Sequence, residues 1–307
     1  MPFVPVSFPE FSNVSAAVII PQVPLLAPYT TNLFGDGLKI EWDISRTRGS
    51  DADTGTVKIY NLSFASRGLI QTTWALLDAL GTPMLCSLSL GWGGIVGQVM
   101  MAQVWKIDPE QRIGEDVVTT LHLGDGIVTT RDAVLGASFA NTTIDIIIKF
   151  LVINGLKAIP DPASLAIISA KAAQLPVQLW ANYVVSTSVG EALDDLLDTL
   201  GLEWKILDGI WLVTDQGNAA TASPVSYLLS AQSGLLTWSR QDSGVIATAL
   251  ANPNVQPGSA ITILDSFNVP VGAPQHRVDT ISFTGATDGD STMSIGARAS
   301  ILVGGVL

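Results

Sequence analysis

The sequence predicts an α+β protein that is mainly β, with two antiparallel, β-barrel-like domains flanking a smaller α/β domain. Short alternating runs without long helices fill both ends of the chain, which is typical of antiparallel barrels or sandwiches. Between them, one amphipathic helix followed by a hairpin indicates a unit of a different kind. The predicted divisions are an extended Pro-rich arm (1–30), a first β domain (31–132), the α/β domain with its linker (133–223) and a second β domain (224–307).

The helix of the α/β domain is the most strongly marked element. Ser188 and Glu191 have the spacing of a capping box, in which each side chain binds a backbone N–H of the first helical turn. The apolar residues that follow form a single stripe: Val189, Ala192, Leu193, Leu196, Leu197 and Leu200. Gly201 comes directly after the stripe, where a left-handed residue ends a helix at low cost.

A β-hairpin is predicted immediately after this helix. Asp208 and Gly209 form a two-residue turn that matches the twist of paired strands. Pairing outward from the turn places Leu207 opposite Ile210. One face of the hairpin then carries Trp204, Ile206, Trp211 and Val213. This face is a suitable surface for the apolar stripe of the helix to cover.

The remaining elements are predicted from alternation, caps and turn residues. In the first β domain the expected strands are 38–44, 56–60, 84–90, 96–107 and 116–123, with a short helix capped by Ser63 and polar loops at 46–54 and 108–115. The α/β domain adds a buried helix from 141 or 142 to 156, an Ala-rich linker at 159–174 and a strand at 178–185. A linker at 217–224 precedes the expected strands 234–238, 245–250, 261–265, 277–283 and 292–297.

The composition is unusually apolar for a solitary soluble chain, at 48% hydrophobic and 14% charged residues. A membrane-spanning helix is not the explanation, because no apolar run reaches the roughly 18 residues that a span needs. The most apolar early run is interrupted by Pro21 and Pro24. No positively charged stretch precedes Lys39, so no signal peptide is expected. Burial between subunits is the better explanation for the apolar surface.

The charge balance argues against stable nucleic-acid binding. The net charge is −12, and acidic residues outnumber basic ones in each of the three main segments. No basic patch is present to hold phosphates, and an acidic surface repels DNA. Cys86 is the single cysteine, so an intrachain disulfide is impossible, which fits assembly in a cytoplasm.

No catalytic, cofactor or metal site is predicted, and the chain is expected not to be an enzyme. His122 and His276 have no ligand partner at metal-binding spacing. Cys86 lies in an expected strand, where a small core residue is the commoner role. Paired carboxylates for sugar hydrolysis can be imagined at Asp194 with Asp195. Those two are adjacent on an exposed helix face, so solvation is the favoured interpretation.

Four segments in order resemble the baseplate hub proteins of contractile-tailed bacteriophages, including the late control protein D group and the hub-like part of type VI secretion spikes. They are a strand, turn and helix at 54–70, a long hairpin with a charged tip at 93–126, the helix and hairpin at 189–217, and the closing strands at 244–263 and 276–299. The Pro-rich arm has no counterpart in this resemblance.

The resemblance implies a homotrimer in which each subunit contributes two β-barrel-like tube domains. Six such domains would form a pseudo-sixfold ring that adapts a hexameric tail tube to a trimeric central spike and leaves an acidic channel for DNA. The implied partners are further copies of the chain, the tail tube protein or tube initiator, the central spike protein and other baseplate proteins. The implied location is the tail baseplate of the virion, with no membrane insertion and no cofactor.

The charged hairpin tip is the predicted contact site with a neighbouring tail component. Asp108, Glu110, Glu115 and Asp116 lie at or beside this tip and are expected to be exposed. Two alternatives remain open at this point. The helix and hairpin could form a peptidoglycan-binding or peptidoglycan-degrading module, with Asp108 and Glu110 as its acidic residues. The chain could also be the hub of a secretion-type contractile injection system.

Overall fold

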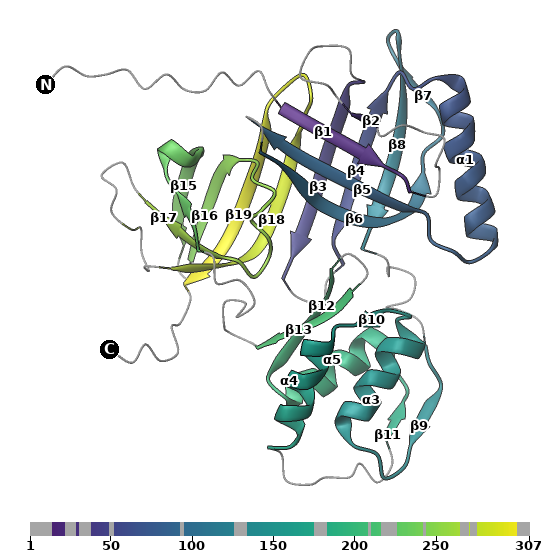
Figure 1. The fold of residues 1–307 in the computed structure, drawn as a ribbon, viewed down its shortest axis with the longest axis vertical. Helices are drawn as coiled ribbons and strands as arrows, with labels where there is room; N and C mark the ends of the chain where they lie inside the picture. The colour runs from purple at the N-terminus through teal and green to yellow at the C-terminus, as the bar shows by residue number, and fades with distance from the viewer. Residues whose placement is uncertain are drawn as a thin grey trace, which may run out of the picture.

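One continuous β-sheet and a smaller α/β unit make up the computed structural model (Figure 1). The structure describes residues 14–21, 29–30, 38–48, 52–92, 95–125, 134–174, 183–207, 210–215, 226–241, 244–264, 270 and 275–299. The chain builds one part of the sheet, then the α/β unit, and then returns to complete the sheet. The expectation of a mainly β, α+β protein is confirmed.

The N-terminal β region covers residues 14–125 and contains one long helix. Its strands are β1 (Val14–Ile19), β2 (Tyr29–Thr30), β3 (Ile40–Thr47), β4 (Thr54–Tyr60), β5 (Leu85–Trp92), β6 (Ile95–Ile107), β7 (Gln111–Ile113) and β8 (Asp116–Gly124). The helix α1 (Phe64–Ala79) begins at the predicted cap, because the Ser63 side chain accepts a hydrogen bond from the backbone N–H of Ser66. It buries Ile70 and lies at the outer side of the sheet (Figure 1).

The C-terminal β region covers residues 226–299. Its elements are β14 (Ser226–Leu229), a 3₁₀ turn (Ala231–Ser233), β15 (Leu235–Gln241), β16 (Gly244–Leu250), β17 (Ala260–Ile263), β18 (His276–Ala286) and β19 (Ser291–Ala299). The five predicted strands are confirmed with small shifts of their bounds, and β14 was not predicted. β14 is short and pairs in parallel with β17, so no hairpin turn in the sequence indicates its position.

The two β regions are joined edge to edge in one sheet. Along the main path the strand order is β15-β16-β19-β18-β3-β4-β8-β6-β5-β1-β2, and 14 described strands belong to the sheet. The joint is the antiparallel pairing of β18 with β3, in which Phe283 lies opposite Ile44. One apolar core underlies both regions and includes Ile44, Leu121, Phe283 and Ile295. The closure of each region into a separate barrel-like tube domain stays a prediction.

The α/β unit covers residues 134–215 and has its own core. Its elements are β9 (Ala137–Phe139), α3 (Ile144–Phe150) continued by a π-helical turn (Leu151–Gly155), β10 (Ile159–Pro160), α4 (Pro162–Ala172), β11 (Tyr183–Val185), α5 (Val189–Thr199), β12 (Leu202–Leu207) and β13 (Ile210–Asp215). No described helix of the chain is both long enough and apolar enough to cross a membrane.

The predicted helix and hairpin are confirmed in detail. Ser188 and Glu191 form the reciprocal capping box of α5, and Gly201 follows the helix with a φ of +64°. The hairpin pairs Leu207 with Ile210, as the turn position requires. All four residues of the predicted apolar face are buried against α5: Trp204, Ile206, Trp211 and Val213. The two turn residues themselves lie outside the described residues.

Two predicted loops are wrong. Residues 159–174 are not a linker but include α4, because Asp161 caps this helix and Pro162 occupies its first turn, where a missing N–H costs nothing. The predicted loop at 46–54 is shortened at both ends, since β3 continues to Thr47 and β4 already begins at Thr54. Arg46 and Asp53 are buried there, because each charge finds an opposite charge inside the protein.

Part of the predicted N-terminal arm belongs to the sheet. β1 runs antiparallel to β5, from Val14 opposite Trp92 to Ile19 opposite Ser87. Within the predicted 108–115 loop, β7 pairs with β8 and forms the end of the long hairpin. Residues 1–13 of the arm and the predicted linker at 217–224 lie outside the described residues.

Candidate functional site at the junction of the three regions

Buried charges meet where the two β regions and the α/β unit come together. Arg46 at the end of β3 donates its Nε proton to Asp53 Oδ2 over 2.8 Å, and both residues are almost fully buried. Lys205 on β12 places its Nζ 2.6 Å from the other carboxylate oxygen of Asp53. Arg46 also donates through Nη1 to Gln256 of the C-terminal β region. One carboxylate therefore connects two cations, and through them all three regions of the chain.

Burial changes the acid–base behaviour of Lys205. Loss of water around its ammonium group lowers the pKa of Lys205 below the usual 10.5, and the negative charge of Asp53 offsets part of this shift. The ammonium also donates to the backbone carbonyl of Thr47. The backbone N–H of Thr47 in turn donates to Asp53 over 2.9 Å. The carboxylate is thus held by backbone and side chains together, as a buried charge requires.

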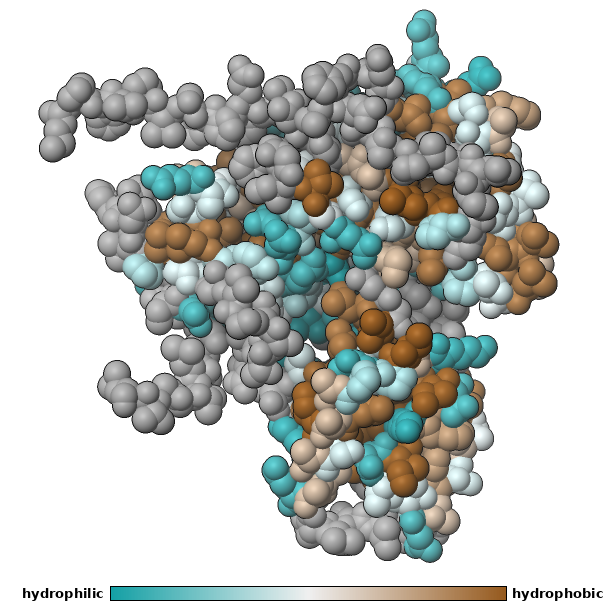
Figure 2. Space-filling view, in the orientation of Figure 1, coloured by the Kyte–Doolittle hydropathy of each residue, from teal (hydrophilic) through white to brown (hydrophobic). Residues whose placement is uncertain are grey.

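A second buried cation, Arg48, extends this junction toward the α/β unit. Its guanidinium lies 3.4 Å from the carboxylate of Glu203 on β12 and donates to Thr214 on β13 over 3.4 Å. The backbone N–H of Arg48 donates to the carbonyl of Asp279 on β18 over 2.8 Å. Hydrophilic side chains are visible in the hollow between the two β regions, above the α/β unit (Figure 2).

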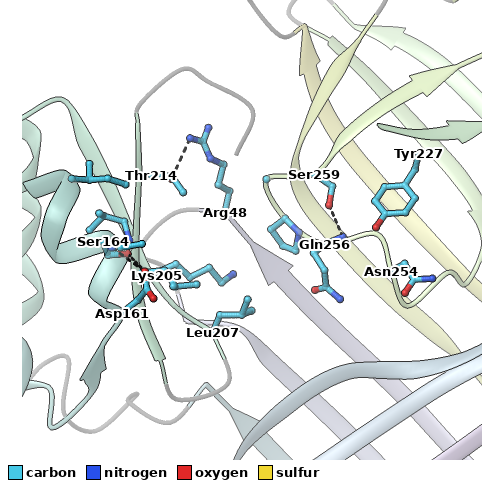
Figure 3. A pocket seen from close by; sticks show the side chains of 16 residues that line it. Arg48, Asp161, Ser164, Lys205, Leu207, Thr214, Tyr227, Asn254, Gln256 and Ser259 are labelled. Carbon is cyan, nitrogen blue, oxygen red and sulfur yellow. Dashed lines mark hydrogen bonds between the residues drawn. The ribbon is translucent and has the colours of Figure 1, made fainter. Parts of the chain in front are cut away.

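A cavity of about 420 Å³ adjoins these charges. Figure 3 shows Ser164 and Lys205 of the α/β unit on one side of it and Tyr227, Asn254 and Ser259 of the C-terminal β region on the other. Asp161, which also lines the cavity, already accepts hydrogen bonds from the backbone N–H and the hydroxyl of Ser164 at the start of α4. The Ser164 hydroxyl also accepts a hydrogen bond from the backbone N–H of Val213 over 3.0 Å, so it is engaged in contacts within the α/β unit.

The predicted hairpin-tip residues are in two different environments. Glu110 and Glu115 are exposed, and Glu110 lies 3.3 Å from Arg67 of α1. Asp116 is half-buried and accepts a hydrogen bond from Asn61 over 2.7 Å. Three of the four carboxylates, those of Asp108, Glu110 and Asp116, therefore contact other groups of the chain, and two of the four residues, Glu110 and Glu115, are exposed.

Asp108 is the most strongly engaged of the four. Its carboxylate lies 2.7 Å from Lys106 and 2.8 Å from His122, and the hydrogen bonds from these two groups lower the pKa of Asp108. A carboxyl group with a lowered pKa is a poor general acid, which argues against a role for Asp108 in protonating a sugar leaving group. Whether the tip contacts a neighbouring tail component stays a prediction.

The other candidates for chemistry are structural in their described surroundings. Complete burial raises the pKa of the Cys86 thiol to about 12, so its reactive thiolate is suppressed. Asp194 accepts a hydrogen bond from the Trp204 indole over 2.6 Å, whereas Asp195 is exposed. The described residues contain no group of three metal-ligating side chains.

Comparison with solved structures identifies the fold. A tail protein from Neisseria meningitidis MC58 matches 93% of this chain and 96% of its own, with a TM-score of 0.59 and 11% identity. The 43 kDa tail protein of prophage MuSo2 from Shewanella oneidensis matches 94% and 99%, with a TM-score of 0.58 and 9% identity. The chain has the fold of phage tail proteins.

The E. coli c3393 protein is also similar in structure to this chain. It is a type VI secretion component described as similar to the T4 tail proteins gp27 and gp5. It matches 88% of this chain and 76% of its own, with a TM-score of 0.59 and 7% identity. No protein-family model and no curated protein sequence matches the chain. The resemblance drawn from the four sequence segments is thus confirmed at the level of the fold, and these similar structures are named as tail or secretion components, not as enzymes.

The sequence analysis did not predict the buried charges at the junction, although the alternation of residues along β3 indicates one of them. Trp42, Ile44 and Arg46 alternate along β3, so the period of the strand places Arg46 on the same inward face as two core residues. An arginine on an apolar face predicts a buried partner of opposite charge. Asp51 and Asp53 are the next acids along the chain, but Lys205 could not be found in this way because it reaches the site from another region.

Proposed function

We propose that the chain is a structural hub of a tail baseplate, a trimeric ring that adapts a hexameric tube to a trimeric spike. The observation that carries this proposal is the continuous sheet of two β regions in a chain with the tail-protein fold. Three chains with two β regions each supply six regions for a sixfold partner. The same three chains retain threefold symmetry for the spike. The acidic balance of the chain suits a channel that DNA traverses without being retained.

The surface of the chain supports ring formation. A cyclic trimer needs two different patches, because each subunit contacts its neighbours head to tail. Phe64 and Leu76 of α1 and its C-cap residue Leu80 are 83%, 60% and 67% exposed, and we call these residues the α1 patch. Leu236 and Trp238 of β15 are 48% and 40% exposed. Figure 1 places α1 and β15 at opposite ends of the molecule, and Figure 2 shows hydrophobic side chains over both. We propose that the α1 patch of one subunit packs against the β15 patch of the next.

The hub would act in the tail baseplate of a virion, after assembly in the host cytoplasm. Its partners would be the tail tube protein or tube initiator, the central spike protein and other baseplate proteins. Glu110 and Glu115 at the exposed hairpin tip are the side chains proposed to reach a neighbouring component. The similarity to E. coli c3393 supports a second candidate, the hub of a secretion-type injection system, which carries the same ring but a different cargo.

Mass measurement of the purified chain and of assembled particles tests the ring. We expect trimers for the unchanged chain. The double variants Leu76→Glu/Leu80→Glu in α1 and Leu236→Glu/Trp238→Glu in β15 should each remain monomeric. An equimolar mixture of the two variants should stop at a dimer, because only one intact contact can form between them.

The matched control is Val184→Glu, which changes an apolar side chain of similar exposure on β11 of the α/β unit. It should trimerise like the unchanged chain. Trimers from both double variants would refute the proposed contact between α1 and β15. A monomer as the only form of the chain in assembled tails would refute the ring itself.

A further inference from the structure

A row of hydroxyl side chains crosses the junction between the two β regions. Six adjacent strands each contribute one residue, and each residue lies directly opposite the next one on the neighbouring strand. In this order the residues are Thr237, Thr248, Ser294, Ser282, Ser45 and Thr54. Directly opposed residues of paired strands point to the same side of a sheet. The six hydroxyls therefore form one uninterrupted row, which we call the hydroxyl row, from β15 to β4.

Flanking rows on the same side have a similar character. On one flank, Thr292, Thr284, Asp43 and Thr56 are successive neighbours on β19, β18, β3 and β4. On the other flank, Thr280 of β18 lies opposite Thr47 of β3. One large apolar side chain on this side, that of Ile246 of β16, is more than a third exposed. The face is thus dominated by short, polar, uncharged side chains.

The other side of the same strands forms the core of the protein. Ile44, Ile281 and Ile295 alternate with the hydroxyl residues and are almost completely buried. The hydroxyl row is not needed to fill that core, and Ser45, Thr54 and Ser294 are exposed. A surface that only meets water commonly carries many interspersed Lys and Glu, and a subunit interface is commonly apolar at its centre. The charged side chains Glu41, Lys58 and Arg298 on this side lie two rows away from the hydroxyl row, so the row itself has neither composition.

The cations near this face are already paired. Lys58 lies 3.8 Å from Glu41, Lys106 lies 2.7 Å from Asp108, and Arg298 lies 2.9 Å from Asp279. Asp43 adds an exposed negative charge to the face itself. Phosphate affinity in nucleic-acid binding arises mostly from cations that release counterions. The positive charge of each of these three side chains is therefore partly neutralised by a carboxylate.

We propose that the hydroxyl face lines the central passage of the ring and is a low-adhesion wall for duplex DNA. This inference rests on the proposed ring, and it assigns the lumen to one side of the sheet. Short hydroxyl groups exchange hydrogen bonds with water readily and attract phosphates far less than ammonium or guanidinium groups do. Continuity across β18 and β3 gives one chain an unbroken wall over two of the six regions.

Cysteine accessibility in the assembled ring tests the position of the face. Ser45→Cys and Ser282→Cys place thiols in the hydroxyl row, and Ser138→Cys places a matched thiol on an exposed strand of the α/β unit. The native Cys86 is fully buried with a pKa raised to about 12, so it stays silent at neutral pH. Each variant is treated with a small maleimide and with a maleimide attached to a globular protein wider than duplex DNA.

In the ring, the two row thiols should react with the small maleimide and resist the bulky one, whereas the Ser138→Cys thiol should react with both. Reaction of the row thiols with both reagents would place the face on the outside, and protection from both would place it in a subunit contact. Either result overturns the assignment while leaving the ring intact. A chain that mass measurement shows to be monomeric even in assembled tails would instead overturn the proposed function, and this assignment with it.

DNA retention tests the low adhesion of the wall. The unchanged ring should show no measurable binding of duplex DNA at moderate salt, and the triple variant Ser45→Lys/Ser282→Lys/Ser294→Lys should gain binding. Its affinity should fall with salt by a logarithmic slope of about 0.9 for each phosphate contacted. The control Ser138→Lys/Ser186→Lys/Thr187→Lys places equal charge on exposed positions of the α/β unit. Equal DNA retention by the unchanged ring and the row variant, or a gain in the control as large as in the row variant, would overturn the proposal.

Discussion

The two β regions are bound to each other differently from the way in which the α/β unit is bound to them. β18 and β3 pair over seven consecutive residues of backbone, from Thr280 opposite Thr47 to Ala286 opposite Glu41. Beneath this pairing, one apolar core contains residues of both regions. The relative position of the β regions is therefore fixed by a hydrogen-bond ladder and by burial, which act over a broad area.

The α/β unit has a separate core and meets the sheet through charged and polar groups. Lys205 reaches Asp53, and Glu203 and Thr214 reach Arg48. Such contacts are directional and few, so the orientation of the unit depends on individual side chains. The comparison indicates that the sheet is the rigid element of the proposed ring, and that the α/β unit is a module attached to it.

Replacing Asp53 should have the largest effect on the attachment of the α/β unit. Asp53→Asn removes the charge that pairs with both Arg46 and Lys205. Leaving buried cations without their counterion costs about 5 kcal/mol, at the upper end for a broken buried pair because two cations are affected. Chemical denaturation should show this loss, together with earlier proteolysis at the connections of the α/β unit.

Lys205→Met is the matched control for that variant. It removes one cation and leaves Asp53 paired with Arg46, so its cost should be clearly smaller. The double variant Asp53→Asn/Lys205→Met should recover part of the stability lost in Asp53→Asn alone. Equal costs for the two single variants would contradict the central place of Asp53 in the junction.

Core truncations should separate the two cores. Phe283 and Trp211 are both fully buried, the first in the shared β core and the second in the core of the α/β unit. Replacing either by Ala should cost about 4 kcal/mol through lost burial and the cavity left behind. Phe283→Ala should destabilise the sheet, whereas Trp211→Ala should increase amide hydrogen exchange in the α/β unit alone. Increased exchange throughout the chain in both variants would show that the cores unfold as one.

Local signals explain how much of this architecture could be predicted. The capping box at Ser188, the stripe of α5 and the turn after Leu207 lie within one short stretch, and each signal supports the others. The pairing of β3 with β18 could not be predicted, because the α/β unit separates these strands in sequence. The residues of a strand edge also do not specify which other strand will pair with it. The helix α4 was missed since Pro160 and Pro162 suggested a linker, although proline is favoured in the first turn.

The junction site and the hydroxyl row could not be predicted from the sequence, and the reason is the same for both. Arg46 could be placed on the inward face of β3 by alternation, but its partners Asp53, Val99 and Gln256 come from both β regions. The hydroxyls of the row are ordinary strand residues one by one, and they form a surface only through the registers of six strands. Sequence patterns give the face of a residue, whereas tertiary pairing decides what stands beside it.

The titration of Cys86 should report on the β core alone. Its pKa is 9.0 in the unfolded chain and about 12 when folded, so the unfolded state loses its proton first as pH rises. The stabilising contribution is fully present below pH 9.0 and is lost progressively toward pH 12. The loss should amount to about 1.4 kcal/mol by pH 10. The difference in pH dependence between the unchanged chain and Cys86→Ala isolates this group, and parallel curves for the two would contradict the burial of the thiol.

Removing the α5 cap should give the smallest effect and should be confined to the α/β unit. Ser188→Ala deletes the side chain that accepts a hydrogen bond from the Glu191 backbone N–H over 3.3 Å. Loss of an N-cap costs about 1 kcal/mol. Ser188→Asp is the control, since a carboxylate can accept the same bond and also favours the positive end of the helix dipole. Hydrogen exchange should rise in α5 and in the hairpin packed on it, and a rise of equal size in β3 and β18 would contradict the independence of the two cores.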